Sequence, residues 1–194
     1  MDSWEALKAA PLRQSGPITA AFVATGTRDF RAAAALISSL DYGRNTSPGD
    51  TLCVLREGRG TCSTKHALLC RLAREQGLDI ALFLGIYEMN EANTPGVGNV
   101  LTAHGLTSLP EAHCFLGSGP KRIDVTRQTE NRSKEAIVPL YEEKIDPDQI
   151  GDYKAILHRR YLSEWLERKP ANVGYTLEHL WRIRERCIAA LQQP

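Results

Sequence analysis

Residues 58–72, with the sequence Gly-Arg-Gly-Thr-Cys-Ser-Thr-Lys-His-Ala-Leu-Leu-Cys-Arg-Leu, constrain the fold more than any other part of the chain. The two glycines interrupt whatever structure precedes them, and Thr61 is a residue type that caps helix N-termini. Apolar residues then recur at helical spacing until Gly77, which favours a helix end. The pattern predicts a buried amphipathic helix that begins at Cys62.

A thiol at the first position of a helix ionises more readily than an ordinary thiol. The N–H groups of the first turn and the positive end of the helix dipole stabilise the thiolate, which is the nucleophilic form. We therefore expect Cys62 to act as a nucleophile. Lys65 is expected on a solvated face of the helix. His66, one turn after Cys62, is a candidate for substrate contact or for packing.

Residues 110–126 supply a base and an orienting carboxylate. They are typical of two short strands joined by the turn Gly-Ser-Gly-Pro at 117–120. His113 lies near the start of the first strand and Asp124 within the second, so an antiparallel hairpin can set their side chains side by side. Because a nucleophilic thiol needs a base and the base needs an orienting group, Cys62, His113 and Asp124 are predicted to form a catalytic triad.

This ordered set of residues resembles the transglutaminase-like, or papain-like, superfamily, which includes bacterial transglutaminase-core proteins and peptide N-glycanases. The likeness rests on the Gly-x-Gly-Thr-Cys start of the helix, the apolar strand over 80–87, His113 and the Asp-Val-Thr ending at 124–126. It covers about residues 30–126, and Tyr42 fits the usual lead-in of that family.

The resemblance implies an α+β fold with a papain/transglutaminase-like core. In that core the nucleophile-bearing helix packs on an antiparallel sheet, and extra helices follow at the C-terminus. It also implies a thiol catalyst that forms an acyl-enzyme from an amide bond and then hydrolyses it or transfers the acyl group. Two departures leave the substrate undefined. The family often has His-Ala-Trp where this chain has His113-Cys114-Phe115, and residues 88–109 are more than a minimal core needs.

The 194 residues are expected to form a single transglutaminase-like domain. Its core spans about residues 28–126, after a lead-in of residues 1–27, and residues 146–194 form a helical appendage. Helices are predicted over residues 3–10, 28–40, 51–57, 147–167 and 177–192, with Thr27 and Thr176 as candidate caps. Strands are predicted over 79–89 and 137–140, and the charged residues 127–135 are expected to be exposed.

The charge composition argues against a broad nucleic-acid-binding surface. Lys and Arg number 24 and Asp and Glu 23, which leaves a net charge of +1. No run of about 18 apolar residues is present, so neither a transmembrane helix nor a membrane partner is expected. The N-terminus lacks the basic start and apolar run of a secretory signal. Because the five cysteines show no metal-binding spacing, we expect reduced thiols in a cytoplasmic protein.

Other residues complete the predicted site. Tyr42, Arg44, His66 and Asn93 are candidates for binding the substrate, which would be a peptide, a protein or a small amide. Neither a cofactor nor a metal is expected in the enzyme. The backbone N–H of Cys62 is one predicted oxyanion donor, and the second donor is unassigned.

The remaining cysteines are assigned by their sequence context. Cys53, Cys70 and Cys187 lie in apolar helical surroundings and are predicted to be core residues. Cys114 follows His113 on a strand, so its side chain should point to the opposite face.

Two other interpretations stay open. Cys62 and His66, four residues apart on one helix, could join His113 around a zinc ion. Alternatively, the chain is a catalytically silent binding protein on the same fold. Within the enzyme interpretation, an arylamine-acetyltransferase-like enzyme is a variant, because those enzymes share the Cys-His-Asp order.

Overall fold

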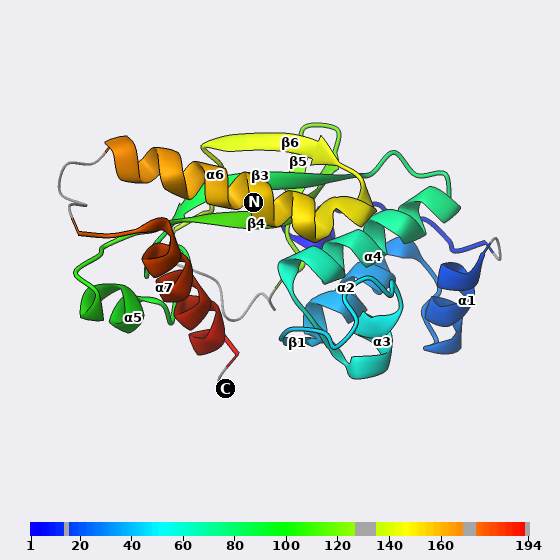
Figure 1. Cartoon of the computed structure of the whole chain (residues 1–194). Helices are drawn as coiled ribbons and strands as arrows, with labels where there is room; N and C mark the ends of the chain where they lie inside the picture. Colours follow the sequence, from blue (N-terminus) through cyan, green and yellow to red (C-terminus); the bar gives the residue numbers. More distant parts are fainter. Residues whose placement is uncertain (14–15, 127–134, 169–173, 193–194) are drawn as a thin grey trace. The chain divides into compact units, whose positions relative to one another are not determined.

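The computed structural model describes residues 1–13, 16–126, 135–168 and 174–192. Its mixture of helices and strands confirms the predicted α+β class (Figure 1). The helices, with η for the 3-10 type, are η1 (Trp4–Ala6), α1 (Pro17–Ala24), α2 (Phe30–Ser39), α3 (Cys53–Glu57), α4 (Cys62–Glu75), α5 (Gly98–Ala103), η3 (Pro147–Ile150), α6 (Asp152–Arg168) and α7 (Leu177–Ala190). The strands are β1 (Asp41–Tyr42), β2 (Arg59–Gly60), β3 (Ala81–Met89), β4 (Leu109–Ser118), β5 (Lys121–Ile123) and β6 (Tyr141–Ile145).

The chain divides into two compact units, each built from three separate segments. The first unit comprises Met1–Leu84, Cys114–Arg132 and Glu143–Gly151, and the second comprises Gly85–His113, Ser133–Glu142 and Asp152–Pro194. The main sheet has the strand order β5-β4-β3-β6, and strands β3, β4 and β6 contribute residues to both units. Of the residues 146–194 expected as an appendage, the first six belong to the first unit and α6 and α7 belong to the second.

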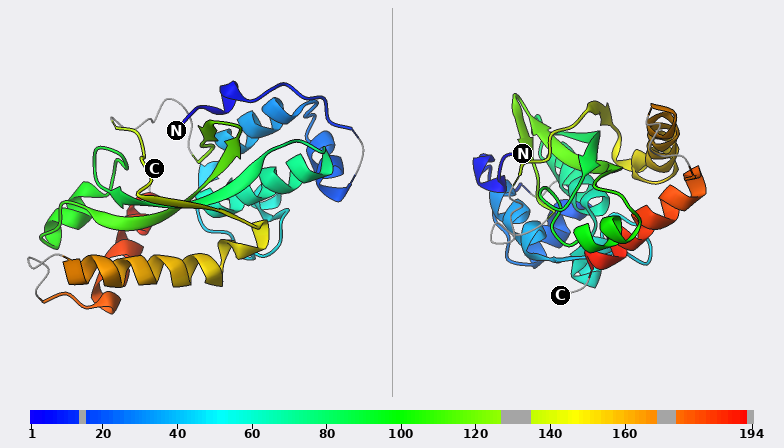
Figure 2. Two further views of the ribbon diagram at one scale, coloured as in Figure 1. Left: turned by 90° about the horizontal axis from the view of Figure 1, so that it is seen from above. Right: turned by 90° about the vertical axis from the view of Figure 1, so that its left-hand side faces the viewer.

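Helix α4 is the centre of the first unit. It packs against α1, α2, α3 and η3, and the views of Figures 1 and 2 show it beside α2 and α3. Nearly its whole surface is buried, including the polar side chains of residues 63–66. A buried polar group needs a hydrogen-bond partner, because burial without one costs about 1–3 kcal/mol. The polar residues of α4 must therefore find partners from the segments around them.

Local signals placed some helix ends correctly and one incorrectly. The predicted cap Thr176 is confirmed at the start of α7, since its Oγ1 accepts the His179 N–H at 3.1 Å. The predicted cap Thr27 is wrong, because the side chain of Asp29 accepts the Ala32 N–H at 2.9 Å and caps α2. Both candidates are capping residue types, and they stand two positions apart.

Other elements differ from the predictions in extent. The predicted helix over 3–10 is only the single turn η1, and α1 was missed although Pro17 suits the first turn of a helix. The strand predicted over 137–140 lies instead at β6. The predicted exposure of residues 127–134 lies outside the described residues, and Glu135 is exposed.

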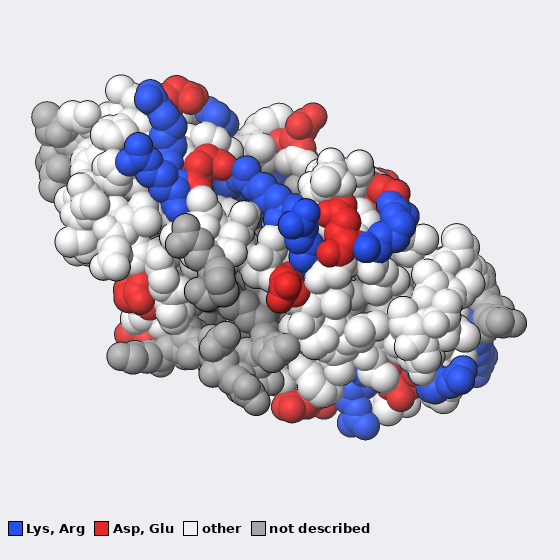
Figure 3. Space-filling view, turned by 90° about the horizontal axis from the view of Figure 1, so that it is seen from below, with Lys and Arg blue, Asp and Glu red and all other residues white. Residues whose placement is uncertain are grey.

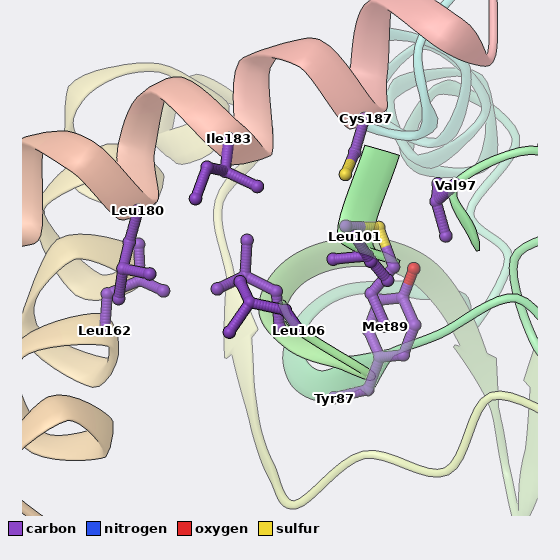
Figure 4. Close-up of a cluster of buried hydrophobic side chains, with 10 residues drawn as sticks. Tyr87, Met89, Val97, Leu101, Leu106, Leu162, Leu180, Ile183 and Cys187 are labelled. Atoms are coloured by element: carbon purple, nitrogen blue, oxygen red, sulfur yellow. The ribbon is translucent and has the colours of Figure 1, made fainter. Parts of the chain in front are cut away.

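The core of the second unit is an apolar cluster of α5, α6 and α7 against the ends of β3 and β4 (Figure 4). Its buried members are Tyr87, Met89, Val97, Leu101, Leu106, Leu109, Leu162, Leu180, Ile183 and Cys187. Residues 88–109 carry α5, whose Leu101 packs into this cluster.

A buried ion pair joins β4 to α7 in the second unit. Arg184 donates to both carboxylate oxygens of Glu111, at 2.7 and 2.5 Å. Beside them, His158 Nε2 donates to the Pro110 carbonyl at 2.8 Å, and the Trp181 ring lies tilted against the His158 ring, with the centroids 5.2 Å apart. Burial alone would raise the pKa of Glu111, but the charge of Arg184 outweighs it and holds that pKa below its usual value. Burial lowers the pKa of His158, so this imidazole is neutral in the fold.

The surface charges are mixed on the face drawn in Figure 3, where Lys and Arg groups alternate with Asp and Glu groups. Ion pairs such as Arg159 with Glu178 and Arg168 with Glu164 belong to this kind of surface. Within the described ranges, none of the helices has the length and apolar character needed to cross a membrane.

Candidate active site

The start of α4 is fixed by a reciprocal pair of threonine bonds. Thr61 Oγ1 accepts the Thr64 N–H at 3.4 Å, and Thr64 Oγ1 accepts the Thr61 N–H at 3.0 Å. This capping box confirms the predicted start at Cys62, which is the first residue of the helix. The same Thr64 hydroxyl donates to Asn45 Oδ1 at 2.8 Å, so the loop after β1 is tied to this turn.

Cys62 differs from the other four cysteines in exposure. Its relative exposure is 7%, whereas Cys53 and Cys70 are at 1% and Cys114 and Cys187 at 0%. A nucleophile must meet its substrate, so this small opening is a requirement of the predicted role. All five thiols are free.

The helical thiols predicted as core residues are buried and hard to ionise. Burial, helped by the nearby carboxylates of Glu57 and Asp50, raises the pKa of Cys53, and burial raises that of Cys70. Burial and then the charge of Glu111 raise the pKa of Cys187 to about 11. The prediction that Cys53, Cys70 and Cys187 are core residues is confirmed.

Ser63 brings a hydroxyl close to two thiols of the first unit. Its Oγ lies 3.9 Å from Cys62 Sγ and 3.6 Å from Cys114 Sγ. Because β4 is continuous through His113 and Cys114, their side chains point to opposite faces of the strand, as predicted. Through this contact Cys114 connects β4 to Ser63 in the first turn of α4.

His66 is fully buried, and both of its ring nitrogens have backbone partners. Nδ1 lies 2.7 Å from the Cys62 carbonyl oxygen, which can only accept. Nε2 lies 2.9 Å from the Val125 N–H, which can only donate. These two bonds define the neutral imidazole protonated at Nδ1. His66 therefore holds backbone together, and the predicted possibility of direct substrate contact gives way to the packing role.

Asp124 lies beside this imidazole. Its Oδ1 is 3.5 Å from His66 Nε2 and accepts the Thr126 N–H at 2.8 Å. The prediction that Asp124 lies within the second strand is wrong, because β5 ends at Ile123 and Asp124 is the first residue beyond it. The first unit thus gathers Cys62 and Asp124 around His66.

Lys65 corrects a prediction. It was expected on a solvated face, yet it has no exposed surface. Its Nζ donates to the Leu40 carbonyl at 2.6 Å and to the Thr126 carbonyl at 3.0 Å. The aliphatic stem passes Gly60, where an added Cβ would lie 3.0 Å from Lys65 Cγ. Gly60 therefore provides room for this side chain.

His113, the predicted base, is the last residue of the β4 segment that belongs to the second unit. Its side chain is buried, and its ring meets the Tyr87 ring edge-on with the centroids 6.0 Å apart. The Tyr87 hydroxyl in turn lies 3.0 Å from Thr94 Oγ1. The imidazole is thus supported by an aromatic side chain that is itself fixed by a hydrogen bond.

The remaining predicted substrate residues lie in different surroundings. Tyr42 is half-buried in β1, which pairs with β2 in parallel, and Arg44 is exposed two residues further on. Asn93 belongs to the second unit, where its Nδ2 donates to the Glu88 carbonyl at 2.9 Å and its Oδ1 accepts the Asn90 N–H at 3.0 Å. The amide of Asn93 is therefore engaged in shaping its own loop.

A metal centre finds no support in the described part of the chain, where no three His, Cys, Asp or Glu side chains form a metal-binding group. The zinc alternative also required a free nitrogen on His66. Nδ1 bonds the Cys62 carbonyl and Nε2 accepts the Val125 N–H, and releasing Nε2 would leave that buried N–H without a partner.

Comparison of the chain with protein-family models, curated proteins and solved structures found no match.

Three residues of the site were not anticipated from the sequence in the roles that the structure gives them. Asn45, Ser63 and Lys65 contact residues that lie far away in sequence or on the neighbouring strand. The available signal was composition: four polar residues in succession, residues 63–66, lie near the start of a helix and are followed by four apolar residues, 67–70. A polar run at the start of a buried helix indicates partners elsewhere in the fold.

Proposed function

We propose that the chain is a thiol-dependent catalyst of the transglutaminase-like type, which acts on amide bonds through Cys62, His113 and Asp124. The observation that carries the proposal is the placement of Cys62. It is the first residue of a capped helix and the most exposed of the five thiols. At this position the backbone N–H groups of the first turn favour the thiolate and can also bind an oxyanion.

The choice of base is supported by what His66 does. His66 is the histidine nearest to Cys62 in sequence, and its two backbone bonds leave neither nitrogen available to accept the thiol proton. We therefore propose His113 as the base, in keeping with the Cys-His-Asp order of the sequence. Along β4 it shares a face with Phe115.

The reaction follows from these roles. The Cys62 thiolate attacks the carbonyl carbon of an amide, and His113 in its protonated form gives a proton to the leaving amine. Asp124 orients the imidazole and stabilises its charged form. Water then hydrolyses the acyl-enzyme, or an amine takes the acyl group. We further propose that the enzyme works with reduced thiols, as in a cytoplasm, in keeping with its five free cysteines.

The test is the pH dependence of iodoacetamide alkylation, followed residue by residue in the native protein. Cys62 should react selectively, with a pH midpoint below the roughly 8.5 of an ordinary thiol. The variant His113→Ala should raise that midpoint, whereas Cys114→Ser should leave it unchanged. If Cys62 reacts no faster than Cys53, or if His113→Ala has no effect, the triad is absent and a binding role on the same fold becomes the better proposal.

A substrate assay then separates hydrolysis from transfer. A peptide amide is offered with and without a primary amine, and the released ammonia and the acylated products are measured. Transfer requires an amide of the added amine to appear, and hydrolysis requires the free acid. The variant Cys62→Ser should abolish both products.

A further inference from the structure

Two consecutive residues of α4 form hydrogen bonds with the backbone that follows Asp124. His66 Nε2 accepts the Val125 N–H at 2.9 Å, and Lys65 Nζ donates to the Thr126 carbonyl at 3.0 Å. The same two side chains also reach back: His66 Nδ1 donates to the Cys62 carbonyl, and Lys65 Nζ donates to the end of α2 at Leu40. The segment after β5 is thereby attached to the first turns of the helix that carries Cys62.

These hydrogen bonds are connected to the carboxylate of Asp124 through Thr126. The Thr126 N–H donates to Asp124 Oδ1 at 2.8 Å, while the carbonyl of the same residue accepts from Lys65. Movement of Thr126 would therefore change the direction of the Asp124 carboxylate. Because His66 holds the intervening Val125, residues 124–126 are fixed at three consecutive positions.

Placing Lys65 in the interior is costly. An ammonium group loses its hydration on burial, and an apolar side chain of similar length would fill the same space without that loss. The hydrogen bonds from Lys65 to the two carbonyls offset part of this cost. They hold Leu40 and Thr126, which lie on two other segments, in place. Such an arrangement is expected where a backbone segment has to be held in one place.

We propose that Lys65 and His66 are positioning residues, which act on the reaction by holding Asp124 in the orientation that the triad needs. This inference rests on the proposed function of the same site. It assigns a role to two residues that neither touch the reacting atoms nor serve only to fill the core.

A double-substitution experiment tests the route of this effect. In Lys65→Met the two carbonyl bonds are lost while the volume is nearly kept, and alkylation of Cys62 at neutral pH should slow about tenfold because its base is misoriented. The same substitution in an Asp124→Asn background should add little, since the carboxylate on which Lys65 acts is already gone. Amide exchange at Val125 and Thr126 should become faster in Lys65→Met.

Matched variants separate positioning from a general loss of stability. Thr126→Val removes a buried hydroxyl for which the described residues offer no hydrogen-bond partner, so the Cys62 profile should not change. His158→Gln alters a buried histidine of the second unit and should lower stability without changing that profile. His66→Asn retains a donor near the Cys62 carbonyl but loses the reach to Val125, and it repeats the test if Lys65→Met does not fold.

The outcomes distinguish the positioning role of Lys65 and His66 from the catalytic triad on which it rests. If His113→Ala and Asp124→Asn both change the Cys62 profile while Lys65→Met and His66→Asn do not, the triad stands and the positioning role is overturned. Equal slowing by Lys65→Met with and without Asp124 also overturns it, because Lys65 would then act independently of Asp124. If His113→Ala has no effect, both proposals fail together.

Discussion

Two of the buried histidines, His66 and His158, are held in opposite ways. His66 in the first unit is bonded on both sides by backbone groups, of Cys62 and of Val125, and so is a neutral tie between two segments. His158 in the second unit donates one bond to a carbonyl and lies 3.9 Å from the carboxylate of Glu111, which Arg184 neutralises. The comparison shows that one residue type serves as a fixed linker in one place and as part of a charged cluster in the other.

The difference bears on function as well as on stability. Near the pair of Glu111 and Arg184, burial raises the pKa of Cys187, and the charge of Glu111 raises it further. The polar bonds around Cys62 involve mainly neutral groups and backbone, with Lys65 and Asp124 as the charged members. A catalytic thiol next to a buried carboxylate would be harder to ionise.

The largest effect is expected from breaking the ion pair. The variant Arg184→Met leaves the carboxylate of Glu111 buried without its cation, and we expect the free energy of unfolding to fall by about 3–5 kcal/mol. Urea denaturation monitored by Trp fluorescence measures it. The double variant with Glu111→Gln should recover part of the loss. The exposed pair of Arg56 and Asp50 supplies the control, since Arg56→Met should leave stability nearly unchanged. An equal loss of stability in Arg184→Met and Arg56→Met would contradict the distinction between the buried and the exposed ion pair.

The second largest loss in the free energy of unfolding is expected from removing the His66 imidazole. In His66→Leu the Val125 N–H loses its partner, which costs about 1–3 kcal/mol if the buried group stays unsatisfied. Denaturation measures the loss in the free energy of unfolding, and faster amide exchange at Val125 would show that the loss arises in the first unit. His158→Leu is the matched change in the second unit and should leave Val125 protected. Loss of Val125 protection in both variants would argue against this assignment.

The charged cluster should also make stability depend on pH. Because burial lowers the pKa of His158 in the fold, the unfolded chain binds the proton more tightly, and stability falls as pH drops below the unfolded value of about 6.5. The slope for one proton is about 1.4 kcal/mol per pH unit. The pKa of Glu111 is also lowered in the fold, so its contribution is present above about pH 4.3 and is lost as pH falls through the folded pKa.

The variant His158→Gln isolates the first of these two contributions. It keeps a donor for the Pro110 carbonyl but has no group that titrates near neutral pH. Denaturation at a series of pH values should therefore show a flatter curve between about pH 6.5 and 5 than the parent protein. An unchanged slope would show that other groups govern stability in this range.

The smallest effect belongs to the start of α4. Thr61→Ala removes the side-chain acceptor for the Thr64 N–H, and we expect a loss of about 1 kcal/mol. Thr61→Ser keeps the acceptor and should lose less. If alanine and serine behave alike in denaturation, the capping box contributes little.

How much of this the sequence could predict depends on the distance over which the interactions act. The start of α4 was predictable because Thr61, the glycines before it and the apolar repeat after it are neighbours in the chain. Lys65 was misassigned because its acceptors, Leu40 and Thr126, lie 25 and 61 residues away. Helical periodicity identifies an apolar face, but it does not show which polar residue is bonded to a distant carbonyl.

The same limit applies to the second unit. Glu111 was taken as part of the hairpin that leads to His113, and its partner Arg184 lies 73 residues further on. The catalytic roles of Cys62, His113 and Asp124 stay predictions. What the sequence could not supply is the way His66 and Lys65 connect Cys62 to the residues after β5.

The close approach between Gly60 and Lys65 carries a consequence for how this chain can change over evolution. A methyl group at position 60 would lie 3.0 Å from Lys65 Cγ and also 3.0 Å from Thr64 Oγ1, so substitution there presses on both side chains. Positions 60, 64 and 65 should therefore vary together, because a shorter residue in place of the lysine relieves only one of the two closest contacts. In a designed library, randomising the three positions jointly would recover folded combinations that single substitutions exclude.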